Sequence, residues 1–438
     1  MPKCGIIYDK AKTPGQKAHL RSRPKPAIGN GRKLKKLVTA SILVVALALY
    51  LNWGKIERIF VAEAGGPVRP LQTDTSVRDL SPLLERERQV QQLPAVAAVV
   101  IKGNRIISRG VTGVRKLGDS TRATLKDRWH LGSCTKPITA TLIAALVERG
   151  AMKWETTIEA ALPFLAADIR REYRNVTVEQ LLAHRGGIRH EWDVPGLWDV
   201  LWKREGIPTE QRRRMAKVML AQEPKQPIGE YFYSNCGYGI AGLMAETMTG
   251  KTWEKLMRDV VFAPLDMQSA SFGVPWEAEP PTDPWPHGKE GNPIPPGRFA
   301  DNPPSIGPGG TVHATIEDWA KFAFDHLKGE RGEYGTLLKP ETYARLHKGR
   351  AIAPGDNNYA LGWNVVERPW AKGSDRGSIG RCLNHAGSNN SWYALIWVAP
   401  ERDLAILCTT NIGGDGVFPK IDQVIWAVIT DYISRAGP

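Results

Sequence analysis

A serine and a lysine three residues apart stand at the start of a long apolar run. The stretch reads WHLGSCTKPITATLIAALVERG, with the serine at Ser133 and the lysine at Lys136. The apolar residues after them recur at helical spacing, which predicts a helix of about fifteen residues that ends near Gly150. Residues three apart share a helix face, and a buried lysine can lose its proton. The pair could therefore supply a nucleophile and its base.

Two further motifs bear on that chemistry. Residues 233–235 (Tyr-Ser-Asn) precede an apolar helical segment, and residues 385–388 (His-Ala-Gly-Ser) lie in a segment with strand composition. A tyrosine phenol can relay a proton, an asparagine amide can hold a carbonyl, and a glycine inside a strand suggests close approach of a ligand backbone. Taken singly, each motif also fits a structural role, as does a rival Tyr-x-Asn at residues 173–175. A second Ser-x-x-Lys, residues 22–25, lies in a basic segment and is interpreted as solvated.

Together and in this order, the three motifs resemble those of the penicillin-recognising, active-serine enzymes. The pattern is most similar to the branch that holds class C β-lactamases, secreted DD-peptidases, D-aminopeptidases and related esterases. The resemblance covers about residues 90–435 and includes the segments LLAHRGGI and GPGGTVHATIEDWAKF. It implies an α/β (α+β) fold of the β-lactamase/transpeptidase type. Such a fold has an antiparallel five-stranded sheet flanked by helices, plus an all-helical region.

The resemblance also implies a role for seven residues. The catalytic residues would be Ser133 as the acylated nucleophile, with Lys136 and Tyr233 sharing the proton transfers. The substrate-binding residues would be Asn235, His385, Gly387 and Ser388. The backbone N–H groups of Ser133 and Ser388 would form the oxyanion hole. No metal and no organic cofactor is implied.

The third motif departs from the Lys-Thr-Gly of class C β-lactamases, because it reads His-Ala-Gly. A lysine stays charged at ordinary pH, whereas a histidine is half-charged near pH 6.5. We therefore expect peptide or ester hydrolysis ahead of β-lactam hydrolysis, with Arg381 on the same strand face as a candidate cation for a substrate carboxylate. Cys134 and Cys236 beside the motifs are interpreted as packing residues, and His184 as a residue that orients a loop.

The order of elements along the chain agrees with such a fold. Strand-like segments come first, with a hairpin around residues 102–104, then many helices, then strands again and a last helix. This order predicts one sheet built from both ends of the chain, with a helical insertion between them. Thr177 and Thr315 are expected to cap helices. The proline-rich residues 279–310 form a long irregular loop that is expected to rim the site.

The N-terminal region carries most of the net charge of +14. Residues 1–36 hold eleven lysines and arginines and one acid, and residues 37–53 carry no charge and span about 25 Å as a helix. We expect a cytoplasmic basic tail (1–36), a transmembrane signal anchor or a signal peptide (37–53) and a linker (54–90). The hydrolase domain (91–438) would then lie outside the cytoplasm, periplasmic or extracellular, anchored or secreted after cleavage. Nucleic-acid binding by the tail is the alternative and is not expected.

Other function classes find little support. Residues 245–252 end like a phosphate loop but lack its first glycine and continue a helix, and there is no HExxH motif. Five cysteines form neither a disulfide framework nor a zinc pattern, and mostly buried thiols are expected. The resemblance implies a DD-peptidase-like or D-amino-acid peptidase that acts on peptidoglycan-type peptides. The alternatives are an esterase or amidase, a class C-like β-lactamase, and a non-hydrolytic binder with this fold.

Overall fold

The computed structural model describes residues 70–275, 282–295, 297, 300–372 and 379–436. The expected basic tail and membrane segment, and residues 54–69 of the expected linker, lie outside the described residues. Within the described ranges, no helix is both long and apolar enough to cross a bilayer.

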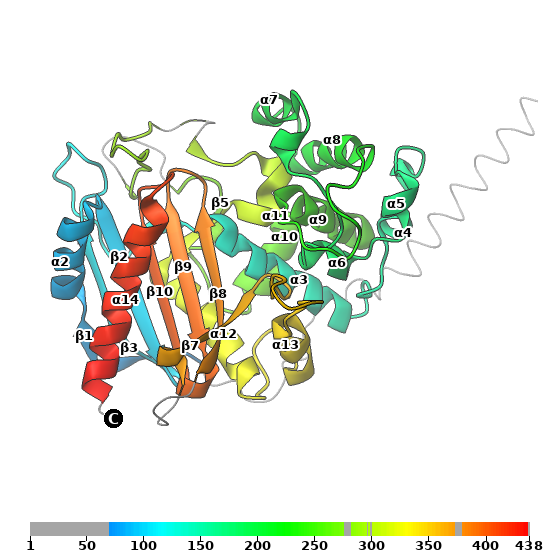
Figure 1. The fold of residues 1–438 in the computed structure, drawn as a ribbon. Coiled ribbons are helices and arrows are strands. Elements are labelled where there is room, and N and C mark those ends of the chain that lie inside the picture. Colours follow the sequence, from blue (N-terminus) through cyan, green and yellow to red (C-terminus); the bar gives the residue numbers. More distant parts are fainter. Residues whose placement is uncertain (1–69, 276–281, 296, 298–299, 373–378, 437–438) are drawn as a thin grey trace, which may run out of the picture. The chain divides into compact units, whose positions relative to one another are not determined.

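A seven-stranded sheet is the centre of the described structure, in the order β1-β3-β2-β10-β9-β8-β7 (Figure 1). All neighbours pair antiparallel except β1 and β3, which pair in parallel. The first three strands come from the N-terminal part of the chain and the other four from the C-terminal part, which confirms the expected origin of the sheet. The strands are β1 (Gln72–Asp79), β2 (Ala95–Lys102), β3 (Arg105–Gly113), β7 (Asn364–Arg368), β8 (Gly380–Ser388), β9 (Tyr393–Ala399) and β10 (Leu404–Thr410).

The expectation of five antiparallel strands was wrong in number and in one pairing, although the fold type is confirmed. The two additional strands are β1 and β7, which form the sheet edges. Neither shows the apolar alternation that marks a half-buried strand, because β1 reads QTDTSVRD and β7 has no fully buried residue. The described elements include two inside the expected linker, since β1 and nearly all of α2 (Ser81–Gln91) lie within residues 54–90. Only Leu83 and Leu84 of α2 are buried, and most of its other residues are charged or polar. The segment therefore lacks the apolar spacing from which a helix is predicted.

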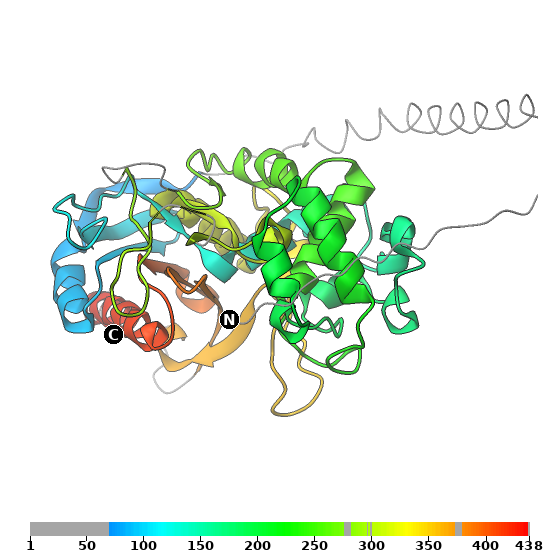
Figure 2. The same ribbon diagram turned by 90° about the horizontal axis from the view of Figure 1, so that it is seen from above.

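Helices cover both faces of the sheet. On one face α2 and α14 (Val417–Ala436) pack against the strands, and on the other face lies α12 (Ile316–Glu330) (Figures 1 and 2). Seven of the eight residues of β2 are buried, because its alternate side chains enter two separate apolar cores. Ala97 and Val99 belong to the larger core beneath α12, whereas Ala98 and Val100 face α2 and α14.

The all-helical region lies beside the sheet and is drawn in green in Figure 2. Thr177 caps α6 and Thr315 caps α12 through their side chains, as expected. The remaining α-helices are α3 (Thr135–Glu148), α4 (Ile158–Ala161), α5 (Arg171–Arg174), α6 (Val178–Leu182), α7 (Leu197–Trp202), α8 (Pro208–Leu220), α9 (Asn235–Thr249), α10 (Trp253–Met257), α11 (Gly307–Gly310) and α13 (Pro340–His347). A π-helical turn, η4 (Arg258–Phe262), continues α10.

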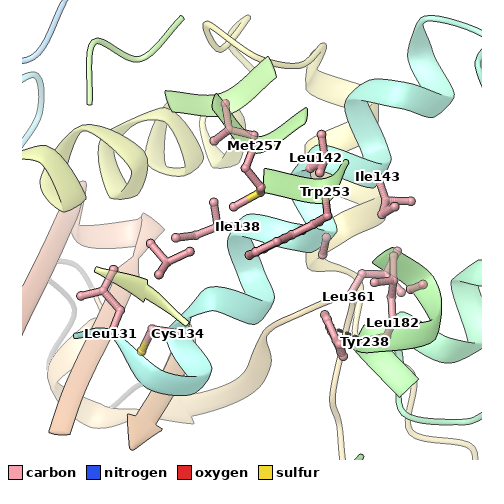
Figure 3. Packing of buried hydrophobic residues seen from close by; sticks show 14 of the residues in the cluster. Leu131, Cys134, Ile138, Leu142, Ile143, Leu182, Tyr238, Trp253, Met257 and Leu361 are labelled. Carbon is pink, nitrogen blue, oxygen red and sulfur yellow. Dashed lines mark hydrogen bonds between the residues drawn. The ribbon is translucent and has the colours of Figure 1, made fainter. Parts of the chain in front are cut away.

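A small three-stranded sheet leads the chain toward the Ser-Lys motif. It consists of β4 (Arg128–His130), β5 (Ser271–Phe272) and β6 (Val312–Thr315), with β6 in the middle. The 3₁₀ turn η1 (Gly132–Cys134) follows β4 directly and opens into α3. The first twelve residues of α3 are all buried, and Figure 3 shows its apolar side chains among residues of α9 and α10. This packing fixes the start of α3 at the junction of the sheet and the helical region.

Candidate active site

Ser133 lies in the turn η1, immediately before α3. Its hydroxyl is within hydrogen-bond distance of Lys136 Nζ, at 3.0 Å, and of the Tyr233 hydroxyl, at 2.8 Å. The three residues come from two segments one hundred positions apart in the chain. The structure therefore brings together the serine, the lysine and the tyrosine that the motifs singled out.

The side chain of Lys136 is completely buried and has three partners. Besides Ser133, its amine contacts Asn235 Oδ1 at 2.8 Å and the Gly309 carbonyl at 2.7 Å. Burial lowers the pKa of Lys136 from 10.5 to about 7, while the nearby carboxylate of Glu191 opposes this decrease. The neutral amine is therefore accessible near neutral pH.

The partners of Lys136 decide where its lone pair points when the amine is neutral. A neutral amine has two N–H groups and one lone pair. The Asn235 and Gly309 oxygens can only accept hydrogen bonds, so they take the two N–H groups. The lone pair then faces the Ser133 hydroxyl, which is the arrangement of a base that accepts the serine proton.

Tyr233 completes the hydrogen bonding of Ser133 from the other side. Burial raises the pKa of Tyr233 well above its usual value, so the phenol keeps its proton and donates to Ser133 Oγ. The Lys136 amine also lies over the Tyr233 ring, 4.6 Å from its centroid. A neutral phenol at this position can give a proton to a leaving group but is a poor first base.

Asn235 is the first residue of α9, and Ser234 caps that helix. The Oδ1 atom of Asn235 accepts from Lys136, so Asn235 Nδ2 points away from the lysine and donates to Glu191 Oε1 at 3.0 Å. Glu191 is fully buried, and its second oxygen lies 3.6 Å from Cys236 Sγ. The sequence analysis missed Glu191, because a single acidic residue in a loop is ordinarily exposed. The carboxylate holds the Asn235 amide in the one orientation that suits Lys136.

Replacing Glu191 with glutamine is expected to shift the acid limb of the pH profile of kcat/KM toward lower pH. Glu191 raises the pKa of Lys136, so its neutralisation lets that pKa fall, and the amine then stays neutral in more acidic solution. Glutamine can still accept from Asn235 Nδ2. The measurement is kcat/KM against pH for both proteins. Glu330→Gln, a change at a mostly buried carboxylate of α12 that pairs with Arg381, serves as the control and should leave the limb in place.

His385 lies on β8, but the structure corrects its expected charge. Its Nε2 is 3.0 Å from the Tyr359 hydroxyl and its Nδ1 is 2.7 Å from the Ala386 carbonyl. The carbonyl can only accept, so Nδ1 carries the hydrogen and Nε2 accepts from Tyr359. Burial and the charge of Lys136 lower the pKa of His385 to about 3. The ring is therefore neutral near pH 6.5, where the sequence alone predicted half-charge.

Arg381 was the other candidate cation of this strand. Its guanidinium pairs with Glu330 at 2.6 Å and donates to the His347 carbonyl at 2.7 Å. These contacts join β8 to α12 and α13. These contacts give Arg381 a structural role, and the prediction that it supplies a cation to the substrate stays untested.

Gly387 and Ser388 bring the end of β8 against the nucleophile turn. A Cβ on Gly387 would lie 2.0 Å from the Leu131 carbonyl and 2.8 Å from Ser133 N. Gly132 has φ +50°, and a Cβ there would lie 2.5 Å from Ser388 N. The two segments that carry the expected oxyanion donors are thus in backbone contact, and only glycines allow that contact.

Substituting Gly387 with alanine should push β8 away from η1. Since one oxyanion donor contributes about 10²–10³-fold to kcat, a loss of that size in kcat is expected, with a smaller change in KM. Steady-state kinetics on an ester substrate would measure it. Gly288→Ala, where a Cβ meets nothing within 4 Å, is the matched control. Unchanged kcat in the Gly387 variant would mean that this strand does not position a donor.

Other residues from the sequence analysis have structural roles. Tyr173 is buried and donates to the Gly187 carbonyl at 3.3 Å, away from the Ser133 contacts. His184 Nδ1 accepts from Ser234 N at 3.1 Å, and the His184 ring lies 4.3 Å from that of Tyr233, so His184 packs against Tyr233. Cys134, Cys236, Cys382 and Cys408 are free and buried. The cysteines beside the motifs therefore pack, as expected.

The end of the proline-rich segment contributes to the site. Gly309, in α11, supplies the carbonyl that holds Lys136. Earlier in the segment, Asp301 lies 2.7 Å from His130 Nε2, and His130 Nδ1 accepts from Gly132 N at 3.1 Å. Asp301 thus supports the turn η1 through its contact with His130. Among the described residues, no cluster of His, Cys, Asp or Glu could hold a metal ion.

Several solved structures share this fold. A class C β-lactamase from Rhodobacter sphaeroides superposes with a TM-score of 0.61 at 20% sequence identity, over 80% of this chain and 98% of that one. SurE bound to D-Leu gives a TM-score of 0.62, also at 20% identity, over 80% of this chain and 74% of that one. At this identity, the likeness concerns the fold.

Relatives and a family model extend the comparison to the sequence. The Aspergillus campestris protein named Unguisins hydrolase ungD' is 26% identical over 68% of this chain, which spans 57% of its length. Penicillin-binding protein 4 of Amycolatopsis lactamdurans is 28% identical, over 73% of this chain and 81% of its own. The model of the family described as Beta-lactamase matches residues 82–428. The chain belongs to the Beta-lactamase family.

Proposed function

We propose that the chain is a serine hydrolase that forms an acyl-enzyme on Ser133. The observation that carries this proposal is the continuous set of contacts from Tyr233 through Ser133 to Lys136. In it a neutral phenol donates to the serine, and a lysine with a pKa of about 7 faces the serine proton. A surface serine beside a charged lysine would have neither feature.

In the acylation step, Ser133 Oγ attacks the substrate carbonyl while its proton moves to Lys136 Nζ. The negative charge that develops on the carbonyl oxygen is stabilised by the N–H groups of Ser133 and Ser388. As the scissile bond breaks, the phenol of Tyr233 protonates the leaving group and regains a proton from Lys136. A water then attacks the ester and gives one proton to the base. The base passes this proton to Ser133 Oγ as the ester bond breaks, which releases the acid and restores the free serine.

We propose a peptide containing D-amino acids, of the peptidoglycan type, as the substrate. Support comes from relatives named as a penicillin-binding protein and as a hydrolase of unguisins, and from the fold shared with a protein solved with D-Leu. The neutral His385 and the paired Arg381 favour scissile bonds without an adjacent free carboxylate. Esters and amides of this kind are the second candidate class.

The location of the enzyme is a separate proposal. The uncharged residues 37–53, after a basic segment, favour a membrane anchor with the hydrolase domain outside the cytoplasm. Protease treatment of spheroplasts that produce the full chain would test this: digestion of the hydrolase domain is expected, and full protection would contradict it.

Intact-mass spectrometry tests the proposed chemistry. The full chain is incubated with a fluorophosphonate, and separately with a penicillin, and each adduct is mapped to a peptide. A phosphonate on Ser133 is expected. A persistent penicilloyl adduct at Ser133 would favour a DD-peptidase, and its absence alongside phosphonate labelling would favour a peptidase, esterase or amidase of other specificity. A fully active preparation on any acyl substrate without labelling at Ser133 would contradict the mechanism.

A further inference from the structure

A row of four rings leads away from the catalytic tyrosine to the surface. The ring of His190 lies 6.3 Å from that of Tyr233 and stacks on Trp192 at 4.5 Å with an interplanar angle of 18°. Trp198 lies 6.0 Å from Trp192, and Trp202 lies 5.5 Å from Trp198. We call His190, Trp192, Trp198 and Trp202 the aromatic row. It runs from the turn η3 (Glu191–Asp193) into α7.

The aromatic row is exposed where an ordinary aromatic cluster would be buried. Trp192 has 58% of its surface accessible, and Trp198 and Trp202 are partly exposed. Single exposed aromatic residues are common on protein surfaces, but a continuous set is characteristic of binding sites. Ligand sites are lined largely by hydrophobic and aromatic side chains. A tryptophan side chain has only two χ angles, so it loses little conformational entropy when a ligand covers it.

Two hydrogen bonds hold the inner end of the aromatic row against the Tyr-Ser-Asn motif. Ser234 Oγ donates to the Arg189 carbonyl at 2.9 Å, and Asn235 Nδ2 donates to Glu191 Oε1 at 3.0 Å. These bonds join the segment that carries His190 and Trp192 to the Tyr-Ser-Asn motif. The position of Trp192 relative to Ser133 is therefore set by the same contacts that set Asn235.

We propose that the aromatic row is a subsite for a large, flat apolar side chain of the substrate, close to the scissile bond. The inference rests on the proposed function and specifies the substrate of the same site. An extended peptide advances about 3.3 Å per residue. Ring-to-ring steps of 6.3 and 4.5 Å from Tyr233 to Trp192 thus place Trp192 within reach of side chains one to three residues from the attacked carbonyl. The rings favour an aromatic or bulky aliphatic group over a charged or small one.

Two pairs of esters test the subsite. One pair varies the acyl part (p-nitrophenyl acetate and p-nitrophenyl phenylpropanoate), and the other varies the alcohol part (methyl acetate and benzyl acetate). The wild type should prefer the phenylpropanoate of the first pair, or the benzyl ester of the second, by about 10-fold in kcat/KM. Apolar pockets commonly discriminate by this factor. Trp192→Ala should abolish that preference, and Trp192→Phe should restore most of it. Trp426→Ala, at a tryptophan of α14 with 50% exposure, should leave the preference unchanged.

The outcomes separate the subsite from the underlying chemistry. Equal kcat/KM for the two members of each pair in the wild type, or equal selectivity in Trp192→Ala and the wild type, would overturn the subsite and leave the serine hydrolase intact. A row that instead serves a protein partner would give this result. Failure of every ester together with failure of phosphonate labelling at Ser133 would overturn the proposed function, and the subsite with it.

Discussion

Replacing Ser133 with alanine is expected to lower kcat/KM by at least about 10⁴-fold, because removing the nucleophile of a serine protease costs at least that much. The side chain is held between a proton donor at 2.8 Å and a proton acceptor at 3.0 Å, and alanine removes the attacking oxygen from both. The variant should also take up no phosphonate. Its fold should persist, since the packing of α3 around the site does not involve the hydroxyl.

A matched serine variant separates chemistry from packing. Ser305 is fully buried in the 3₁₀ turn η6 (Pro304–Ile306), and Ser305→Ala should retain most of the wild-type rate. Initial rates on an ester, together with the melting temperature of each protein, make the comparison. Retention of a tenth or more of the activity in Ser133→Ala would show that another group is acylated.

The contacts among Ser133, Lys136 and Tyr233 could be predicted from the sequence because each motif carries its own local structure. Lys136 lies in the first turn of a helix that apolar spacing predicts, Ser133 lies in the 3₁₀ turn directly before that helix, and Ser234 caps the helix that begins at Asn235. What remained open was whether residues separated by one hundred positions meet. The order of motifs and their resemblance to a known family supplied that information, and the 2.8 Å contact between Tyr233 and Ser133 agrees with it.

The electrostatics of the site could not be predicted in the same way. His385 was expected to be half-charged near pH 6.5, because its ordinary pKa lies there. Its actual state depends on burial beside Tyr359, from another part of the chain, and on the charge of Lys136. The role of Glu191 was not predicted either, because it also depends on burial by distant residues. Its burial follows from the packing of a loop against the Tyr-Ser-Asn segment, and no periodic pattern encodes that contact.

The edges of the fold were also hard to predict, for a different reason. Strand prediction relies on one buried face, and the edge strands β1 and β7 are too exposed to show one. The central strands β2 and β10 are buried on both faces and were therefore visible as apolar runs. The parallel pairing of β1 with β3 cannot be predicted from the sequence of either strand alone, because strand direction and register depend on the partner strand.

Lys136→Met is expected to reduce kcat/KM by about 10³–10⁴-fold, a loss comparable to that of other activated nucleophiles deprived of their base. The acid limb near pH 7 should also disappear from the residual rate, since its titrating group has been removed. Lys328→Met is the matched control, because Lys328 is also buried but pairs with Asp325 on α12. Activity within about 10-fold of wild type in Lys136→Met would place the base elsewhere.

Stability measurements distinguish this loss from unfolding. The folded pKa of Lys136, about 7, lies below the unfolded value of 10.5, so its burial opposes folding most strongly below pH 7, and this penalty diminishes as pH rises from 7 toward 10.5. Methionine removes the penalty but leaves Asn235 Oδ1 and the Gly309 carbonyl without their donor, which costs about 1–3 kcal/mol for each buried acceptor. The two effects oppose each other, so the melting temperature should change little while activity collapses. Because only the wild type carries the titrating amine, its stability should rise relative to the methionine variant between pH 7 and 10.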